Sequence, residues 1–193
     1  MSKKFTILFL CLAVGLVGAG VADAQAEKPE KTGPKVDEEI VKAWQMNTEQ
    51  AEATAKNPSA KITVRYIALK KLCSGGYDDK KLIPLLMAAL GPEMAPHLPI
   101  QRLAIIELAK RKHEPAGAML YMIVINNAAD WELRKAAEAG LEQVVPNFPE
   151  TLKGALLKAE NKPGDPPDPK KIEDAVKLYA AQLGPRFGQA APK

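Results

Sequence analysis

Hydrophobic residues between positions 58 and 145 recur with helical spacing, and no segment there alternates with period two over a useful length. Three segments share one arrangement, in which an aliphatic residue precedes Arg or Gln, Ala follows three positions on, and Leu four beyond: Val64-Arg65-Ala68-Leu72, Ile100-Gln101-Ala104-Leu108 and Leu133-Arg134-Ala137-Leu141. They are offset by 36 residues (65 to 101) and 33 residues (101 to 134). A period in this range indicates an array of helical repeats.

The same pattern, read with its breaks, predicts almost only helices. We expect them at about 36–56, 58–73, 78–90, 98–111, 114–126, 131–144, 148–159 and 170–183. Asn57 and Pro58 form a helix start, and Asp130 caps another. Pro84 fits only a first turn, so the regular part of its helix is expected to begin near Leu82. The segment 114–126 is apolar nearly all round, which predicts burial on two sides.

The N-terminal residues have the pattern of a targeting signal. Lys3 and Lys4 precede an uncharged stretch, residues 5–21, and two small-x-small cleavage sites follow, ending at Ala24 and Ala26. This is typical of a secretory signal peptide, residues 1–26, so the protein is expected to be exported to the periplasm or secreted, with no integral membrane segment after cleavage. The alternative is an uncleaved anchor. Lipidation at Cys11 is disfavoured because the bulky Leu10 precedes it.

The mature chain divides into five expected parts. Residues 27–35 should form a disordered tether, 36–159 the repeat domain, 160–169 a Pro-rich linker, 170–184 a capping helix and 185–193 a disordered tail. The capping helix has a one-sided apolar stripe: Ile172, Val176, Tyr179 and Leu183. Such a helix covers the open end of an array, or it serves as an amphipathic ligand for a partner.

Composition and charge support this fold class and exclude some functions. Hydrophobic residues make up 47% of the chain but aromatic residues only 5%, which suits thin helical layers better than a β-sandwich. Loss of Lys3, Lys4 and Asp23 with the signal peptide lowers the net charge from +4 to +3. That charge is too small to indicate binding of nucleic acid or of an anionic membrane.

The repeat resembles the short bacterial form of the HEAT repeat, which is often named for bilin lyases. The matching motifs are Asp130-Trp131-Glu132-Leu133-Arg134 and Ile83-Pro84-Leu85-Leu86. The resemblance implies an all-α fold, a right-handed α-solenoid of about three helix pairs with capping helices at both ends. It covers about half of the chain. It implies little about function, because such scaffolds have many unrelated roles.

The middle repeat departs from the HEAT pattern. In the family, an Asp and an Arg tie one repeat to the next, and Arg65 and Arg134 occupy the Arg position here. The middle repeat has Gln101 instead, with Arg102 beside it. The Asp position is filled by Lys61, His97 and Asp130 in turn. We therefore expect the bonding between repeats to change at the middle one.

No motif in the sequence predicts catalysis. The only histidines, His97 and His113, are 16 residues apart, and Cys73 is the one cysteine of the mature chain, so we expect neither a metal site nor a disulfide within the chain. Cys73 is interpreted as a small buried side chain at a helix end, or else as an exposed thiol that pairs with another chain. No phosphate-binding loop or nucleophile motif is present, so no cofactor and no enzymatic activity are expected.

The function hypothesis is therefore a scaffold that binds a protein partner through the face formed by the second helix of each pair. Trp131 follows a helix cap and Tyr121 lies on such a second helix, so both are candidate exposed aromatic residues. Lys80, in a short basic cluster, is the third predicted partner-binding residue. The alternatives are a small enzyme or cofactor carrier, which would need a deep polar pocket, and a structural accessory module.

Overall fold

The computed structural model describes residues 37–91, 97–162 and 164–189, and every regular element in these ranges is helical. The prediction of an all-α fold is therefore confirmed for the part of the chain described. The expected signal peptide and the expected tether both lie outside these residues.

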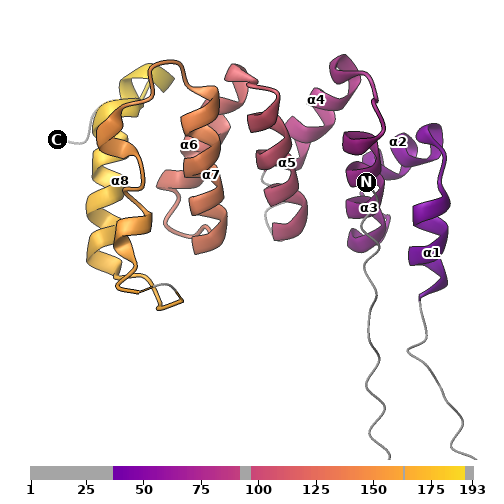
Figure 1. The fold of residues 1–193 in the computed structure, drawn as a ribbon, viewed down its shortest axis with the longest axis horizontal. Helices are drawn as coiled ribbons and strands as arrows, with labels where there is room; N and C mark the ends of the chain where they lie inside the picture. Colours follow the sequence, from indigo (N-terminus) through magenta and orange to yellow (C-terminus); the bar gives the residue numbers. More distant parts are fainter. Residues whose placement is uncertain (1–36, 92–96, 163, 190–193) are drawn as a thin grey trace, which may run out of the picture. The chain divides into compact units, whose positions relative to one another are not determined.

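The first helices pack around a central one (Figure 1). Helices α1 (Glu38–Gln45) and α2 (Thr48–Lys56) both contact α3 (Ile62–Ser74). The prediction of one helix over 36–56 was wrong, because Asn47 ends the first segment and caps the second. Its Oδ1 accepts a hydrogen bond from the Gln50 backbone N–H at 2.8 Å, and the Gln50 side chain accepts one from the Asn47 N–H at 2.9 Å.

The next helices pack as pairs that are consecutive in the sequence. Helix α4 (Asp79–Ala89) packs on α5 (Leu98–Lys110), and α6 (Gly117–Ile125) packs on α7 (Trp131–Val144) after the short 3-10 helix η2 (Glu114–Ala116). Contacts also join α3 to α5 and α5 to α7. These three helices begin with the three repeated segments, so the sequence repeat corresponds to a row of neighbouring helices.

One predicted helix start was displaced. Helix α3 begins at Ile62, because the Asn57 side chain instead accepts a hydrogen bond from Ser59 N–H within a turn. Helix α4 begins at Asp79, close to the predicted start at 78, and the Asp78 carboxylate caps it. The prediction that its regular part begins near Leu82 was wrong, because the helix is regular from Asp79 and Pro84 lies inside it.

The predicted helix over 148–159 is absent from the structure. The segment contains two short 3-10 helices, η3 (Glu150–Leu152) and η4 (Leu157–Ala159). Lys153 is extended, and Gly154 has φ +66°, which is a left-handed conformation that ends the helical path. Its apolar residues are nevertheless buried: Leu152, Leu156 and Ala159.

The last helix, α8 (Pro169–Leu183), packs against α6, η3 and η4. Ala175, Tyr179 and Leu183 are buried, whereas Ile172 and Val176 of the expected stripe are only partly covered. A 3-10 helix, η5 (Gly184–Phe187), follows. The prediction of a disordered tail from 185 was wrong for this stretch, since the Phe187 ring lies 5.2 Å from that of Tyr121 and the Arg186 guanidinium donates to Pro146 O at 2.9 Å.

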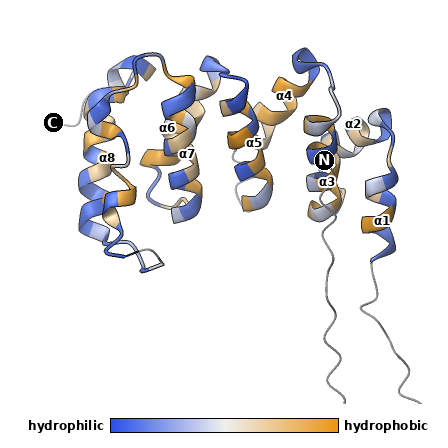
Figure 2. Cartoon of the chain, in the orientation of Figure 1, coloured by the Kyte–Doolittle hydropathy of each residue, from blue (hydrophilic) through white to orange (hydrophobic). Residues whose placement is uncertain are grey.

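The core is continuous from α2 to α8. In Figure 2 the helices carry both hydrophobic and hydrophilic residues, as expected for helices packed on one side. Gly140 of α7 lies at a close crossing, because an added Cβ would lie 3.0 Å from Ile105 Cγ2 and 3.1 Å from Leu120 Cδ1. A glycine therefore lets α7 approach α5 and α6 closely.

Candidate functional site

A groove of about 860 Å³ lies where α5, α6 and α7 meet the end of α4. We call it the methionine groove. Its lining is mainly aliphatic: Leu90, Leu98, Gln101, Met119, Met122, Ile123, Ile125, Asn126, Ala128, Ala129, Asp130 and Leu133. A concave apolar surface built by several helices is a typical binding site.

The apolar sequence of α6 supplies one wall of the groove. Its buried face holds Gly117, Leu120, Tyr121 and Val124. Met119, Ile123 and Ile125 are only partly covered, and the Met122 side chain is 49% exposed. The expectation that this helix is buried on two sides was therefore wrong, because its second apolar face lines the groove.

Three polar residues line the groove. The Asp130 carboxylate accepts a hydrogen bond from Leu133 N–H at 3.1 Å, and Asn126 Oδ1 accepts one from Ala128 N–H at 3.0 Å. Gln101 is only 3% exposed, and its Oε1 has no hydrogen-bond partner among the described residues. None of the described lining residues is Lys, Arg or His.

Gln101 occupies the position that arginine holds in the other two repeats, since each is the fourth residue of its helix. The Arg134 guanidinium donates through Nε to Asn126 O at 2.8 Å, at the end of α6. Arg65 Nη2 lies 3.5 Å from Ala55 O, near the end of α2. Both arginines thus tie a helix to the one before it, and burial lowers the pKa of Arg134.

A second concavity of about 370 Å³ lies beside Arg65. Three basic side chains contribute to it, Lys56, Arg65 and His97, together with aliphatic residues of α3, α4 and α5. Lys56 is also hydrogen-bonded to Glu52 on its own helix. The pocket is smaller than the methionine groove. Its ionisable lining residues are basic, whereas the ionisable residue of the groove lining is Asp130.

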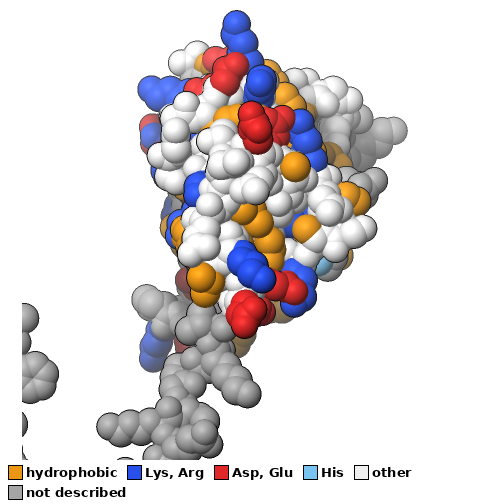
Figure 3. Space-filling model, turned by 90° about the vertical axis from the view of Figure 1, so that its right-hand side faces the viewer, with side chains coloured by type: hydrophobic (Ala, Val, Ile, Leu, Met, Phe, Trp, Pro, Cys, Tyr) orange, Lys and Arg blue, Asp and Glu red, His pale blue; other side chains and the backbone are white. Residues whose placement is uncertain are grey.

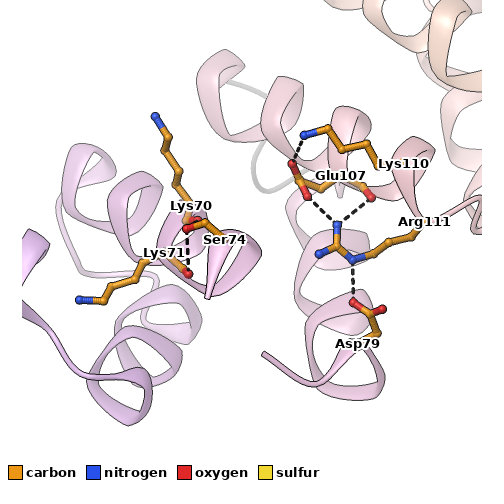
Figure 4. A network of polar contacts seen from close by, with 7 residues as sticks. All are labelled: Lys70, Lys71, Ser74, Asp79, Glu107, Lys110 and Arg111. Atoms are coloured by element: carbon orange, nitrogen blue, oxygen red, sulfur yellow. Dashed lines mark hydrogen bonds and ion pairs between the residues drawn. The ribbon is translucent and has the colours of Figure 1, made fainter. Parts of the chain in front are cut away.

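A polar network joins α5 to the start of α4 (Figure 4). Arg111 donates to Asp79 Oδ1 at 2.7 Å and to Glu107 Oε2 at 2.5 Å, and Lys110 Nζ lies 2.7 Å from Glu107 Oε1. Burial raises the pKa of the Glu107 carboxyl, but hydrogen bonds from Lys110 and Arg111 outweigh it and hold the pKa below its usual value. The charges of the network compensate one another, which is typical of a structural role.

Cys73 lies half-buried near this network. Burial raises the pKa of its thiol to about 11, and the Glu107 carboxylate acts in the same direction. The thiol is therefore protonated at neutral pH and behaves as a small apolar side chain.

We accordingly expect Cys73 in the folded protein to react slowly with iodoacetamide at pH 7.5. A pKa about two units above that of a free thiol lowers the thiolate fraction by about a hundredfold. Mass spectrometry of alkylated protein over time measures the rate, and the denatured protein is the reference. Equal rates in the folded and denatured states would contradict the expectation.

The three predicted partner-binding residues lie in different environments, and none of them lines the groove. Tyr121 is only 1% exposed, so the expectation of an exposed ring was wrong. Trp131 is partly covered, and its Nε1–H donates to Glu160 Oε1 at 2.6 Å. Lys80 is exposed in the first turn of α4. Whether Trp131 or Lys80 touches a partner stays a prediction.

The end of the row of helices at α1 has a further apolar surface. Figure 3 faces this end and shows hydrophobic side chains between charged ones. Val41 and Trp44 are exposed on α1, and Lys70 Nζ lies 5.9 Å from the Trp44 ring. A nearby apolar pocket of about 300 Å³ is formed by α1, α3 and Pro99.

Sequence reasoning missed one buried polar cluster. Glu138 of α7 is 4% exposed, and its Oε1 accepts hydrogen bonds from Tyr179 OH at 2.8 Å and from Leu156 N–H at 3.1 Å. Burial raises the pKa of Glu138 and of Tyr179. The sequence did contain a signal for this burial. Glu138 directly follows Ala137 and lies three residues before Leu141, so helical spacing places it beside the apolar face of α7.

Searches of the described residues for a metal site and for a membrane-spanning helix, and of the chain for similar proteins, gave no match. Within the described ranges, no group of three or more His, Cys, Asp or Glu side chains could hold a metal ion. No described helix is long and apolar enough to cross a membrane. No family model, curated protein or solved structure matches the chain.

Proposed function

We propose that this chain is an exported α-solenoid of HEAT-like repeats that binds a protein partner through the methionine groove and performs no catalysis of its own. The observation that carries the proposal is the groove itself, with Met122 half exposed at its edge. Exposed methionines are common on surfaces that receive apolar side chains of a partner, because the thioether chain adapts its shape.

Two further observations support the proposal. The row α3, α5 and α7 places the repeated segments side by side, as stacked repeats require. The methionine groove draws its lining from four helices and the 126–130 turn, so a partner segment would contact several repeats at once. Export rests on the signal-like residues 1–26.

Site-specific photo-cross-linking tests this function. A photoreactive amino acid in place of Met122, in the full chain produced in cells, is expected to capture a protein partner. The same residue in place of Leu157 is the matched control, since Leu157 is also exposed and apolar but lies on η4.

Met122→Lys should then weaken partner binding by about tenfold or more without changing the melting temperature, because it places a charge on an apolar contact. Leu157→Lys should leave binding unchanged. Retention of the partner by Met122→Lys, or capture from position 157 instead, would contradict binding through the groove.

A further inference from the structure

The fourth residue of α3, α5 and α7 shows that the middle repeat lacks an arginine. Arg65 and Arg134 each reach a carbonyl at the end of the preceding helix. Gln101 has the same backbone position, with its N–H bonded to His97 O at 3.2 Å as Arg134 N–H is to Asp130 O at 3.0 Å. A glutamine has a shorter side chain and a single amide donor group, so it cannot replace the five-donor guanidinium.

The methionine groove extends to this position. Gln101 lines the methionine groove together with Leu90, which ends α4. Its Oε1 is buried and without a partner among the described residues. A buried acceptor of this kind favours a ligand that brings a hydrogen-bond donor.

The charge of the groove selects the donor. Among the described residues, the lining contains the Asp130 carboxylate and the oxygens of Gln101 and Asn126 and no basic side chain. The neighbouring Arg134 guanidinium is already bonded to Asn126 O and Asn127 Oδ1. A cation is therefore complementary to the groove. Arginine suits it better than lysine, because a guanidinium is planar and weakly hydrated and lies readily along apolar side chains such as Met119 and Met122.

We propose that the methionine groove accepts an arginine side chain of the partner, flanked by apolar residues, in the place that Arg65 and Arg134 fill in the other repeats. This inference rests on the proposed function and names the chemistry of the partner segment. The guanidinium donates to Gln101 Oε1, and the flanking residues pack on Met119, Met122 and Ile123.

The test uses two small ligands with the full mature chain. Nα-octanoyl-argininamide carries the cation and an apolar chain, and Nα-octanoyl-citrullinamide has the same shape without the charge. Isothermal titration, with NMR shifts of the methionine methyl groups, measures affinity and place. We expect the arginine ligand to bind about tenfold more tightly or better, with shifts at Met119 and Met122.

Three variants sharpen the result. Gln101→Met keeps the side-chain size and removes the acceptor, so the preference for arginine over citrulline should disappear. Gln101→Arg supplies the missing arginine from within, so it should weaken binding of the arginine ligand by about tenfold or more. Gln143→Arg adds the same charge at an exposed site on α7 and should bind as the wild type does. Melting curves confirm that each variant is folded.

Equal affinity for the two ligands, or unchanged binding by Gln101→Arg, would overturn the inference. If that happens while Met122 still cross-links to a partner, the arginine inference fails and the proposed function stands. If the arginine ligand binds as expected but position 122 captures no partner, the groove recognises arginine and the proposed protein partner is wrong.

Discussion

Truncation after Glu160 is expected to lower the melting temperature by about 10 °C or more and to promote aggregation. The deleted part includes α8, which packs on α6, η3 and η4, and η5, whose Phe187 ring lies 5.2 Å from that of Tyr121 on α6. Tyr179 and Leu183 are fully buried, and each large apolar side chain contributes about 1.5–3 kcal/mol through burial. Their loss would expose the apolar surface of α6 to water.

Polar contacts add to the effect of this truncation. Thr151 OH donates to Gln182 Oε1 at 2.6 Å, and Arg186 donates to Pro146 O at 2.9 Å. Glu138 would lose the Tyr179 hydroxyl and be left as a partly buried carboxylate with fewer donors. These contacts make α8 an integral part of the packed unit.

A thermal melt followed by circular dichroism measures the change, with light scattering for aggregation. A chain that ends at Gln189 is the matched control, because it keeps all of the contacts named above, and its melting temperature should stay within about 1 °C of the full chain. If the longer truncation melts as the full chain does and loses only partner binding, α8 is a recognition element and its stabilising role is disproved.

Local signals in the sequence predicted some elements well. Helix α7 begins at Trp131 and ends at Val144 as expected, because Asp130 is a strong cap and Val145-Pro146 stops the helix. Helix α8 begins at Pro169 after the Asp168 cap for the same reason. Where capping chemistry and apolar periodicity agree, the sequence alone locates a helix.

Competing local chemistry explains the misses. The periodic apolar pattern over 36–56 conceals the Asn47–Gln50 capping box, which starts a second helix. The apolar spacing over 148–159 suggests a helix, but Gly154 adopts a positive φ and the residues are buried without one. Periodicity indicates which residues are buried more reliably than it indicates the backbone conformation.

The candidate site was only partly predictable. The substitution of Gln101 for arginine is visible in the repeat alignment, but its position in a groove depends on how α4, α5 and α6 pack. The prediction that the Tyr121 ring is exposed was wrong for a related reason. Its ring is covered by Phe187, 66 residues further along the chain, and no local pattern reports such a contact.

The second large effect is expected at Tyr179. Replacement by alanine should lower the free energy of unfolding by about 3–5 kcal/mol, because it empties a fully buried aromatic site. Tyr179→Phe keeps the ring and removes the hydroxyl that lies 2.8 Å from Glu138 Oε1 and 3.2 Å from Leu152 O. It should cost about 1–3 kcal/mol, the usual penalty for a buried polar group without its partner. Urea unfolding of the three proteins measures these differences.

The Tyr179–Glu138 contact also predicts a dependence on pH. Burial raises the pKa of Glu138 above its ordinary value of 4.5, against the opposing effect of its hydrogen bonds from Leu156 and Tyr179. As pH rises from 4.5 through the raised value, the unfolded chain releases this proton first. The folded state therefore loses stability over this window, whereas below pH 4.5 the group is protonated in both states and contributes no such loss.

Glu138→Gln should remove that loss, because glutamine stays neutral and keeps an oxygen that can accept both hydrogen bonds. The stability of Glu138→Gln relative to the wild type is thus expected to increase between pH 4 and pH 7. Urea unfolding at several pH values measures the difference, with Glu114→Gln, at an exposed site on η2, as the control that should show no such trend. A relative stability that falls with pH would mean that Glu138 is stabilised as a carboxylate in the folded protein, and that its hydrogen bonds outweigh its burial.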